Sequence, residues 1–469
     1  MKIKVKFFQS SFSLTMLKIL SQFSNYRNSA IYSKECIEEN KYTYIYKGEV
    51  EIPPLSMVDD IICVSECGFK SVMINSFLSC KICTKKLQFG SGKCKKMHIG
   101  KKHEEYKCHS IFVDNWKEVD GIDEAGNEVI KDICVGKVKM EEAEEEKYLG
   151  DTIAKDGRNL KNIQARVNKG KGIAKRILDI LEGIPFEKLY FQIAIILRNS
   201  LLVSSVLCNS EAWFNITKSE LDLIETVDLM FLRSLLGAPK SVAKEILYLE
   251  SGVLPLREII RQRRLNFLHY ILSQGSDTII FKVFETQNKY RNKKDWVTRV
   301  ENDLLELDMN VTFANIQKMN KTTWKNMVRS TIQQKTFKKL ENKKQTHSKV
   351  KNLKYIRLEM QEYLKPHGVK NVNKEVTQNI FRIRSKVINL KINRKNQYEN
   401  YECKVCLVED GSQEHIYECK MIWDLKQKNN MKVPKYEKIL GGNVEEMIKV
   451  ERIFRENMTI HDEYELKPL

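Results

Sequence analysis

The stretch Leu55-Ser56-Met57-Val58-Asp59-Asp60-Ile61 places two adjacent carboxylates between segments that read as short β-strands. Residues 41–52 before it read as two strands joined by a glycine turn, and residues 61–64 after it read as another. A hairpin tip with two carboxylates suits divalent metal such as Mg²⁺ in nucleotidyl transfer, because hard cations prefer oxygen ligands. Solvated turns carry the same pair, so Asp59 and Asp60 alone do not identify a metal site.

The composition indicates a folded protein with a polyanionic partner. A chain of 469 residues can form two or more domains, and contents of 42% hydrophobic and 30% charged residues argue against disorder. The 80 Lys and Arg residues exceed the 61 Asp and Glu residues, which gives a formal charge of +19. Such a surplus favours nucleic acid first and an acidic membrane surface second.

The chain shows no pattern typical of a membrane or secreted protein. It has no run of about 18 apolar residues, so we expect no membrane span. The basic start is not followed by a clear small-residue cleavage site, which predicts an intracellular protein, nuclear or cytoplasmic, without a signal peptide. The 12 cysteines are then expected to be thiols or metal ligands rather than disulfides.

The periodicity changes from β-like to helical near residue 159. Before that point we expect a turn and short strand over 87–100, a hairpin insertion over 106–139 and a strand with a glycine turn over 148–153. Beyond it, apolar residues recur three and four positions apart. Helices are predicted over residues 159–181, 186–214, 219–236 and 255–272, with helical, basic sequence over 280–400. Thr217 is a plausible cap of the third helix, and Pro255 lies in the first turn of the fourth. The expected fold class is α+β.

The order of these pieces resembles the second half of a right-hand polymerase palm followed by its thumb. Their amino-acid sequences are similar to those of reverse transcriptases of non-LTR (LINE-type, jockey-like) retrotransposons, over about residues 31–419. The matching pieces are Pro53-Pro54-Leu55-Ser56-Met57-Val58-Asp59-Asp60, Lys86-Leu87-Gln88-Phe89-Gly90 through Lys93-Cys94-Lys95-Lys96-Met97-His98, Lys147-Tyr148-Leu149-Gly150, Ser210-Glu211-Ala212-Trp213 and Arg263-Arg264-Leu265-Asn266-Phe267-Leu268-His269-Tyr270.

The resemblance implies a domain order. It is an unassigned segment (1–30), a partial palm (31–155), a helical thumb (156–245), a helical basic connector (246–400), a CCHC-type zinc knuckle (401–422) and a tail (423–469).

The resemblance also implies site residues. Asp59, and more weakly Asp60, match the catalytic pair that binds Mg²⁺, and Lys93 matches a palm lysine that protonates the leaving pyrophosphate. Lys93 reads equally well as a solvated turn lysine. The primer grip, whose backbone positions the 3′ end, corresponds to Tyr148, Leu149 and Gly150, which could also form a plain edge strand.

The chain departs from the family at a position that the metal site needs. Two-metal transfer uses a further aspartate from an earlier strand, which binds both ions with the hairpin aspartate. No Asp precedes Asp59, and Glu35, Glu38 and Glu39 lie in a segment that reads as helix or turn. The fingers and the nucleotide-binding part of the palm have no counterpart either. We therefore expect an amino-terminally truncated enzyme that is catalytically defective alone.

A second constellation consists of Cys403, Cys406, His415 and Cys419. Two thiolates two residues apart, followed by a histidine and a cysteine, can supply the tetrahedral ligand set of a structural zinc ion. Similar clusters end many non-LTR reverse transcriptases. Four unrelated core or surface residues are the alternative.

A third group, Cys80, Cys83, Cys94 and His98, has a spacing that would also allow zinc. Cys80 falls on an apolar helical face, where a cysteine behaves as a small hydrophobe. Core thiols are the favoured interpretation.

The helix over residues 159–181 supplies the binding argument. Its apolar residues share one face, and the cations Lys161, Lys169, Lys175 and Arg176 lie on the other, where they can meet phosphates. A solvated amphipathic helix would show the same pattern. Residues 335–354 and 381–386 add further cations, without the aromatic alternation that base stacking needs.

These observations predict a reverse-transcriptase-derived protein that binds RNA or a template–primer duplex. Two alternatives stay open. One is an active RNA-directed DNA polymerase completed by another chain, and the other is a zinc-containing nucleic-acid-binding relic without an enzymatic role.

Overall fold

The computed structural model describes residues 2–10, 44–46, 50–52, 55–57, 60–65, 88–89, 93–99, 111–122, 128–148, 150–183, 189–213, 215–291, 295–365, 372–388, 390, 402–426 and 433–463. These residues form mixed helix and strand and are mostly helical, so the α+β class is confirmed at this level. The chain divides into two compact units. Unit 1 comprises residues 1–166, 209–221 and 260–328, and unit 2 comprises residues 167–208, 222–259 and 329–469.

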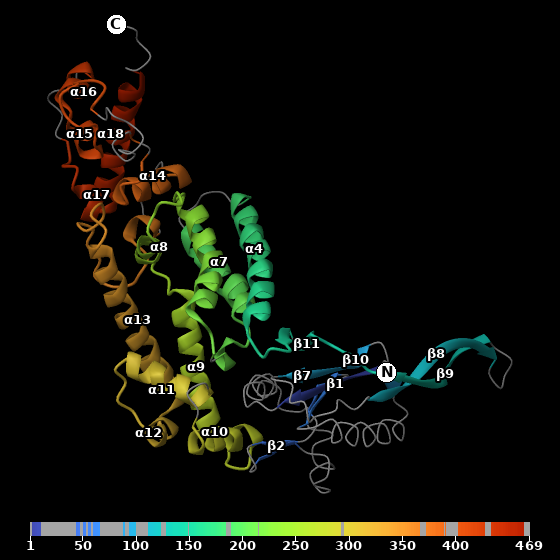
Figure 1. The fold of residues 1–469 in the computed structure, drawn as a ribbon. Helices are drawn as coiled ribbons and strands as arrows, with labels where there is room; N and C mark the ends of the chain where they lie inside the picture. The colour runs from blue at the N-terminus through green and yellow to red at the C-terminus, as the bar shows by residue number, and fades with distance from the viewer. Residues whose placement is uncertain are drawn as a thin grey trace. The chain divides into compact units, whose positions relative to one another are not determined.

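Unit 1 contains a sheet with the strand order β10-β7-β1-β5-β4, in which β6 also pairs with β1 (Figure 1). The bounds are β1 Lys2–Ser10, β4 Leu55–Met57, β5 Asp60–Ser65, β6 Gln88–Phe89, β7 Lys95–Ile99 and β10 Glu141–Glu142. Strand β1 runs parallel to both β5 and β7. A segment without predicted structure therefore supplies the central strand. Its cue in the sequence is the alternation of lysine with Ile3, Val5 and Phe7, which is typical of a strand.

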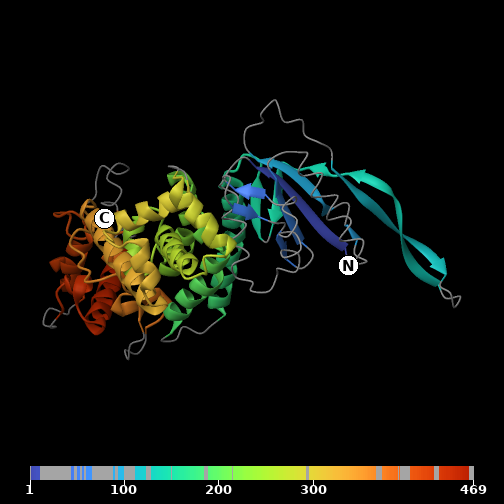
Figure 2. The ribbon, with the colours of Figure 1, turned by 90° about the horizontal axis from the view of Figure 1, so that it is seen from below.

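Within this sheet, β4 pairs with β5 in antiparallel orientation, with Met57 opposite Asp60, which confirms the predicted hairpin. The strands outside the sheet also form antiparallel pairs. The other pairs are β2 (Tyr44–Tyr46) with β3 (Val50–Ile52), β8 (Phe112–Ile122) with β9 (Glu128–Lys139), and β11 (Glu145–Tyr148) with β12 (Asp151–Ala154). The predicted hairpin insertion is thus the long β8–β9 ribbon (Figure 2).

The other elements of unit 1 are helical, namely η3 (Ser210–Ala212), α10 (Ile279–Lys289), α11 (Trp296–Glu306) and α12 (Phe313–Lys318). Two of the sequence motifs, 210–213 and 263–270, meet here. Arg264 donates to the carbonyl oxygen of Trp213 from Nε at 3.1 Å and from Nη2 at 2.6 Å, and it also pairs with buried Asp303. Trp296 donates from Nε1 to the carbonyl oxygen of Glu211 at 2.8 Å. These motif residues hold the helices of unit 1 together.

Helices α4 (Leu160–Glu182), α7 (Lys218–Leu236), α9 (Leu256–Leu272) and α13 (Lys321–Gln345) contribute residues to both units. The predicted caps are confirmed. Thr217 Oγ1 accepts from the N–H of Glu220 at 3.2 Å, and the Glu220 carboxylate accepts from the N–H of Thr217 at 2.7 Å, which is a capping box. Helix α9 begins directly after Pro255, where a missing N–H costs no helical hydrogen bond.

The helix predicted over 186–214 is found over residues 190–206. It consists of α5 (Tyr190–Leu197), a π-helical turn η2 (Arg198–Val203) and α6 (Ser204–Val206), so it is shorter than predicted and is not α-helical throughout. The extra residue of a π turn re-aims the side chains around it. Buried Arg198 makes a bidentate pair with buried Asp228, at 2.6 and 2.7 Å.

The remaining elements of unit 2 are α8 (Lys244–Ser251), η4 (Glu362–Leu364), α14 (Lys374–Arg384), α15 (Gln413–Glu418), α16 (Lys420–Leu425), α17 (Lys438–Gly441) and α18 (Val444–Glu463). Helix α18 packs against α14, α15 and α17. The segment assigned to a tail, 423–469, includes α17 and one of the longer helices of this unit, α18.

A buried carboxylate holds several of these elements. The fully buried Glu250 of α8 accepts hydrogen bonds from Tyr355 Oη at 2.6 Å and from Tyr363 Oη at 2.7 Å. Arg384 of α14 pairs with it at 3.0 Å and also donates to backbone carbonyls of α17. These partners satisfy the buried charges, which would otherwise be costly.

None of the described helices combines the length and the apolar composition that crossing a membrane requires.

Candidate metal centre

Four potential ligands converge in unit 2. The sulfur atoms of Cys403, Cys406 and Cys419 and a ring nitrogen of His415 all lie within 4.8 Å of one another. In a tetrahedral site with Zn–S bonds of about 2.3 Å, neighbouring sulfurs lie about 3.8 Å apart. The cluster therefore has nearly the dimensions of an occupied zinc site.

The first two cysteines lie on a tight backbone loop. The N–H of Cys403 donates to the Glu409 carbonyl at 2.7 Å, and the N–H of Leu407 donates to the Cys403 carbonyl at 2.8 Å. Leu407 adopts a left-handed conformation, with φ of 54°, which turns the chain directly after Cys406. A bridge between Glu402 and Asp410 closes the loop.

The histidine is positioned by the start of α15. Ser412 caps this helix by accepting from the N–H of His415 at 3.0 Å. The His415 Nδ1 atom lies 3.0 Å from a Glu409 carboxylate oxygen, and Nε2 faces the Cys406 sulfur at 3.2 Å. A carboxylate on one imidazole nitrogen orients the other toward a metal.

The fourth ligand lies at the junction of α15 and α16, and α18 supports it from outside. Cys419 precedes α16, and its carbonyl accepts from Trp423 N at 3.1 Å. Asn457 of α18 is fully buried and donates to the carbonyls of Ile416 and Tyr417, at 2.9 and 3.0 Å. The ligand loop is therefore fastened to a helix about 40 residues further along the chain.

The thiols differ in electrostatic environment. Burial alone would raise the pKa of the Cys406 thiol, but backbone N–H donors from Glu409 and Val408 lower it to about 7. Burial raises the pKa of the Cys419 thiol to about 11, and negative charge on Cys403 and Cys406 adds to the rise. A bound dication stabilises coordinated thiolates, so the donor set is one that zinc suits. All four positions are protein side chains, which leaves no open coordination position.

The structure describes the predicted polymerase residues in part. Asp59 and Leu149 lie outside the described residues, and Asp60 begins β5. Lys93 is exposed. Gly150 occupies the β11–β12 turn with φ of 86°, a conformation that glycine adopts without strain, and Tyr148 ends β11.

The turn between β11 and β12 is anchored by a cluster of polar side chains that was not predicted. Buried Asp151 pairs with Arg166 Nη2 at 2.5 Å, and it accepts from Asn162 Nδ2 at 2.8 Å and from Asn209 Nδ2 at 3.0 Å. Arg166 also donates to the Gly150 carbonyl at 3.3 Å. The only signal was the aspartate directly after Gly150, which is also a common turn residue.

Helix α4 has the predicted two faces. Ile163, Val167 and Ile177 are buried, as are Ala174 and Leu181. The predicted cations Lys161, Lys169, Lys175 and Arg176 are exposed, as is Lys171. Leu160, at the start of the helix, is 41% exposed and so departs from the apolar face. Lys161 pairs with Glu145 at 2.9 Å, so its charge is partly compensated.

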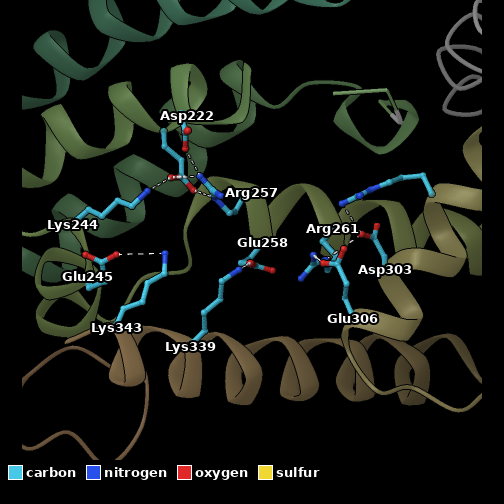
Figure 3. Close-up of polar contacts among 12 residues, drawn as sticks. Asp222, Lys244, Glu245, Arg257, Glu258, Arg261, Asp303, Glu306, Lys339 and Lys343 are labelled. Atoms are coloured by element: carbon cyan, nitrogen blue, oxygen red, sulfur yellow. Dashed lines mark hydrogen bonds and ion pairs between the residues drawn. The ribbon is translucent and has the colours of Figure 1, made fainter. Parts of the chain in front are cut away.

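Three lysines of the basic segment 335–354 lie close to carboxylates. Lys343 lies 3.9 Å from Glu245, and Lys339 lies 4.0 Å from Glu258 (Figure 3). Lys344 is fully buried and pairs with a carboxylate three residues earlier. These contacts join α13 to α8 and to the first turn of α9.

The stretch 381–386 behaves similarly. Arg384 is buried against Glu250, and Lys386 pairs with a carboxylate of α15 at 2.5 Å. Arg382 donates from Nε to the Gly237 carbonyl at 2.9 Å.

The third cysteine group is only partly described. Cys80 and Cys83 lie outside the described residues, and the side chain of His98 does as well. Cys94 is 1% exposed, as expected of a core thiol.

No protein-family model matches the chain, and searches among curated proteins and solved structures also gave no match.

Proposed function

We propose that this protein is a reverse-transcriptase-like protein that binds RNA or a template–primer duplex, with a structural zinc ion and without polymerase activity of its own. The observation that carries the proposal is the exposed cationic face of α4. The opposite face of this helix is buried in the core, so the helix and the cations that it carries have a fixed position.

Lys169, Lys175 and Arg176 form the part of this face that is available to a ligand. Within the described part of the chain, none of the three has a carboxylate within ion-pair distance. The cations of α13 differ, because acidic neighbours compensate several of them. Rows of uncompensated cations bind phosphates with release of counterions, and the overall charge of +19 acts in the same direction.

The cluster of Cys403, Cys406, His415 and Cys419 supports a structural zinc ion. It would be held by three thiolates and one imidazole, and its role would be structural rather than catalytic. The ion would cross-link the 403–406 loop to α15 and α16, and α18 would hold the assembly through Asn457.

The strands around the aspartate hairpin support the absence of nucleotidyl transfer. Within the described residues β5 pairs with β1 and β4, and neither strand contains a carboxylate. The residue of β1 in register with Asp60 is Lys4. Two-metal transfer needs a further carboxylate beside the hairpin, and these neighbours do not supply one.

Filter binding of the full chain to a labelled RNA hairpin from low to high salt tests the proposal. We expect micromolar, sequence-tolerant affinity whose logarithm falls linearly with the logarithm of salt concentration. A combined Lys169→Ala, Lys175→Ala and Arg176→Ala variant should make the salt slope less steep by roughly 2. Each lost phosphate contact reduces the magnitude of the slope by about 0.7–0.9.

The matched control removes three exposed lysines elsewhere, Lys318, Lys321 and Lys325, by alanine substitution. It changes the formal charge equally and should leave the slope near the wild-type value. Equal slopes for all three proteins would refute the α4 assignment, and no binding at low salt would refute nucleic-acid binding itself.

A further inference from the structure

Unit 2 contains a cavity of about 1110 Å³ that the proposed function does not use. It lies among α7, the turn that follows it, α14 and α18. Its volume slightly exceeds the range of about 300–1,000 Å³ typical of small-molecule sites, so it has room for more than one aromatic ring system.

The lining combines apolar side chains with four cations, which we call the cationic rim. Apolar side chains include Leu229, Met230, Ile383, Phe454 and Met458. The cations are contributed by separate elements, namely Arg233 and Lys240 by α7 and its following turn, Arg382 by α14 and Arg455 by α18. One carboxylate, that of Glu451, accompanies these four cations.

Arg233 contributes a donor that is not satisfied. Its Nε is buried and has no hydrogen-bond partner among the described residues, and its Nη2 reaches the Val242 carbonyl only at 3.4 Å. A buried guanidinium donor without a partner is costly. The Arg233 side chain lines the cavity, where its positive charge favours an anionic ligand.

Polar groups inside the cavity complete a donor and acceptor set. Asn379 Nδ2 donates to Glu451 at 3.2 Å, and Arg455 lies 3.5 Å from the same carboxylate. Burial raises the pKa of Glu451, whose side chain is 1% exposed. Asn379 and Glu451 thus place an amide and a carboxylate among the apolar lining residues, with the carboxylate almost fully covered.

We propose that this cavity binds unpaired nucleobases of a single-stranded RNA or DNA segment, whose phosphates contact the arginine rim. The inference rests on the proposed function and adds to the α4 face a second surface that binds nucleic acid. A nucleobase has two apolar faces and a polar edge, and an anionic phosphate follows it along the strand. Those features match an apolar interior, an internal amide and carboxylate, and a cationic rim.

An acidic peptide fits less well. Its carboxylates would satisfy the rim, but Asp and Glu side chains offer little to the apolar interior, and Glu451 would repel them. A duplex cannot enter, because its bases are stacked and paired. The cavity should therefore discriminate between single strands and duplexes, whereas the α4 face should not.

The test measures fluorescence anisotropy of the full-length protein with a labelled 12-nucleotide oligouridylate and with a 12-base-pair RNA duplex. Ser234→Trp places a large ring at the exposed edge of the cavity, and Arg455→Ala removes a rim cation. We expect each variant to weaken single-strand binding at least fivefold and duplex binding less than twofold. Arg452→Ala is the matched control, because Arg452 is exposed on the same helix and does not line the cavity.

Photocrosslinking of wild-type protein with a 4-thiouridine oligonucleotide gives a readout that does not depend on variant folding. Crosslinks should map to residues 226–240, 379–388 or 451–458. Single-strand binding that is unchanged in both variants, with crosslinks elsewhere, would overturn the cavity site and leave the proposed function intact. Absence of binding to either RNA would refute the proposed function. Cavity-dependent binding of a glutamate- and leucine-containing 12-residue peptide, without such an effect on RNA, would assign the cavity to a protein partner.

Discussion

The two predicted metal sites of this chain differ in how far apart their ligands lie in the sequence. Cys403, Cys406, His415 and Cys419 lie close together along the chain, and their ligand atoms converge within 4.8 Å. The aspartate hairpin also forms, but its site needs a carboxylate from a distant strand. The strand beside β5 contributes Lys4 at the position in register with Asp60. A site whose ligands are all local can be completed by local folding, whereas a site with distant ligands depends on which strands pair.

The largest effect should come from the local site. Cys403→Ser should abolish zinc binding and unfold residues of roughly 402–422, because folding free energy in such modules comes from the metal, about 10–16 kcal/mol in isolated peptides. Metal analysis and hydrogen exchange of the purified protein measure both outcomes. Cys208→Ser, at an exposed thiol, is the control and should retain the metal. Equal zinc in both variants would rule out this ligand set.

The next largest effect should come from the buried ion pair of Glu250 and Arg384, whose members lie far apart in the sequence. Glu250→Ala leaves Arg384 without its carboxylate in the core, so we expect unfolding free energy to fall by about 3–5 kcal/mol in urea titrations. Glu359→Ala removes a carboxylate whose Arg357 partner is largely exposed and should change stability little. Similar losses in both variants would show that burial of the Glu250 cluster is not what matters.

Two glycines of α4 distinguish tertiary from local effects within one helix. A Cβ at Gly170 would lie 2.6 Å from Val206 Cγ2, so Gly170→Ala should destabilise unit 2 by about 1–3 kcal/mol through overpacking. A Cβ at Gly172 would meet nothing within 4 Å, so Gly172→Ala should stabilise by up to about 1 kcal/mol through helix propensity. Thermal unfolding of both proteins gives the comparison. The same sign for both would contradict the close packing at Gly170.

The smallest effect should come from the incomplete site. On a primed RNA template with magnesium or manganese we expect no dNTP incorporation by the chain, and Asp59→Ala should behave identically. Positioning and charge neutralisation supply most of the catalysis in phosphoryl transfer, and Asp59 with Asp60 offers only part of the metal ligands. Incorporation by the wild type that disappears in Asp59→Ala would show that another group completes the site.

Local patterns predicted much of this molecule. The β4–β5 hairpin, the buried and exposed faces of α4, the Thr217 cap and the convergence of the zinc ligands all follow from residues a few positions apart. Backbone geometry fixes the periods of strands and helices and the reach of a capping or ligating side chain, so such features can be recognised without knowing the rest of the fold.

Only the tertiary structure decided the features that join distant segments. They include β1 as the central strand and Asp151 as the anchor of the β11–β12 turn. They also include the Glu250 cluster and the cavity lined by α7, α14 and α18. Glu250 and Arg384 are 134 residues apart, and neither has a neighbour that identifies its partner. Parallel strand pairing and buried ion pairs depend on which surfaces meet when the core closes, and a local stretch of sequence carries no record of that choice.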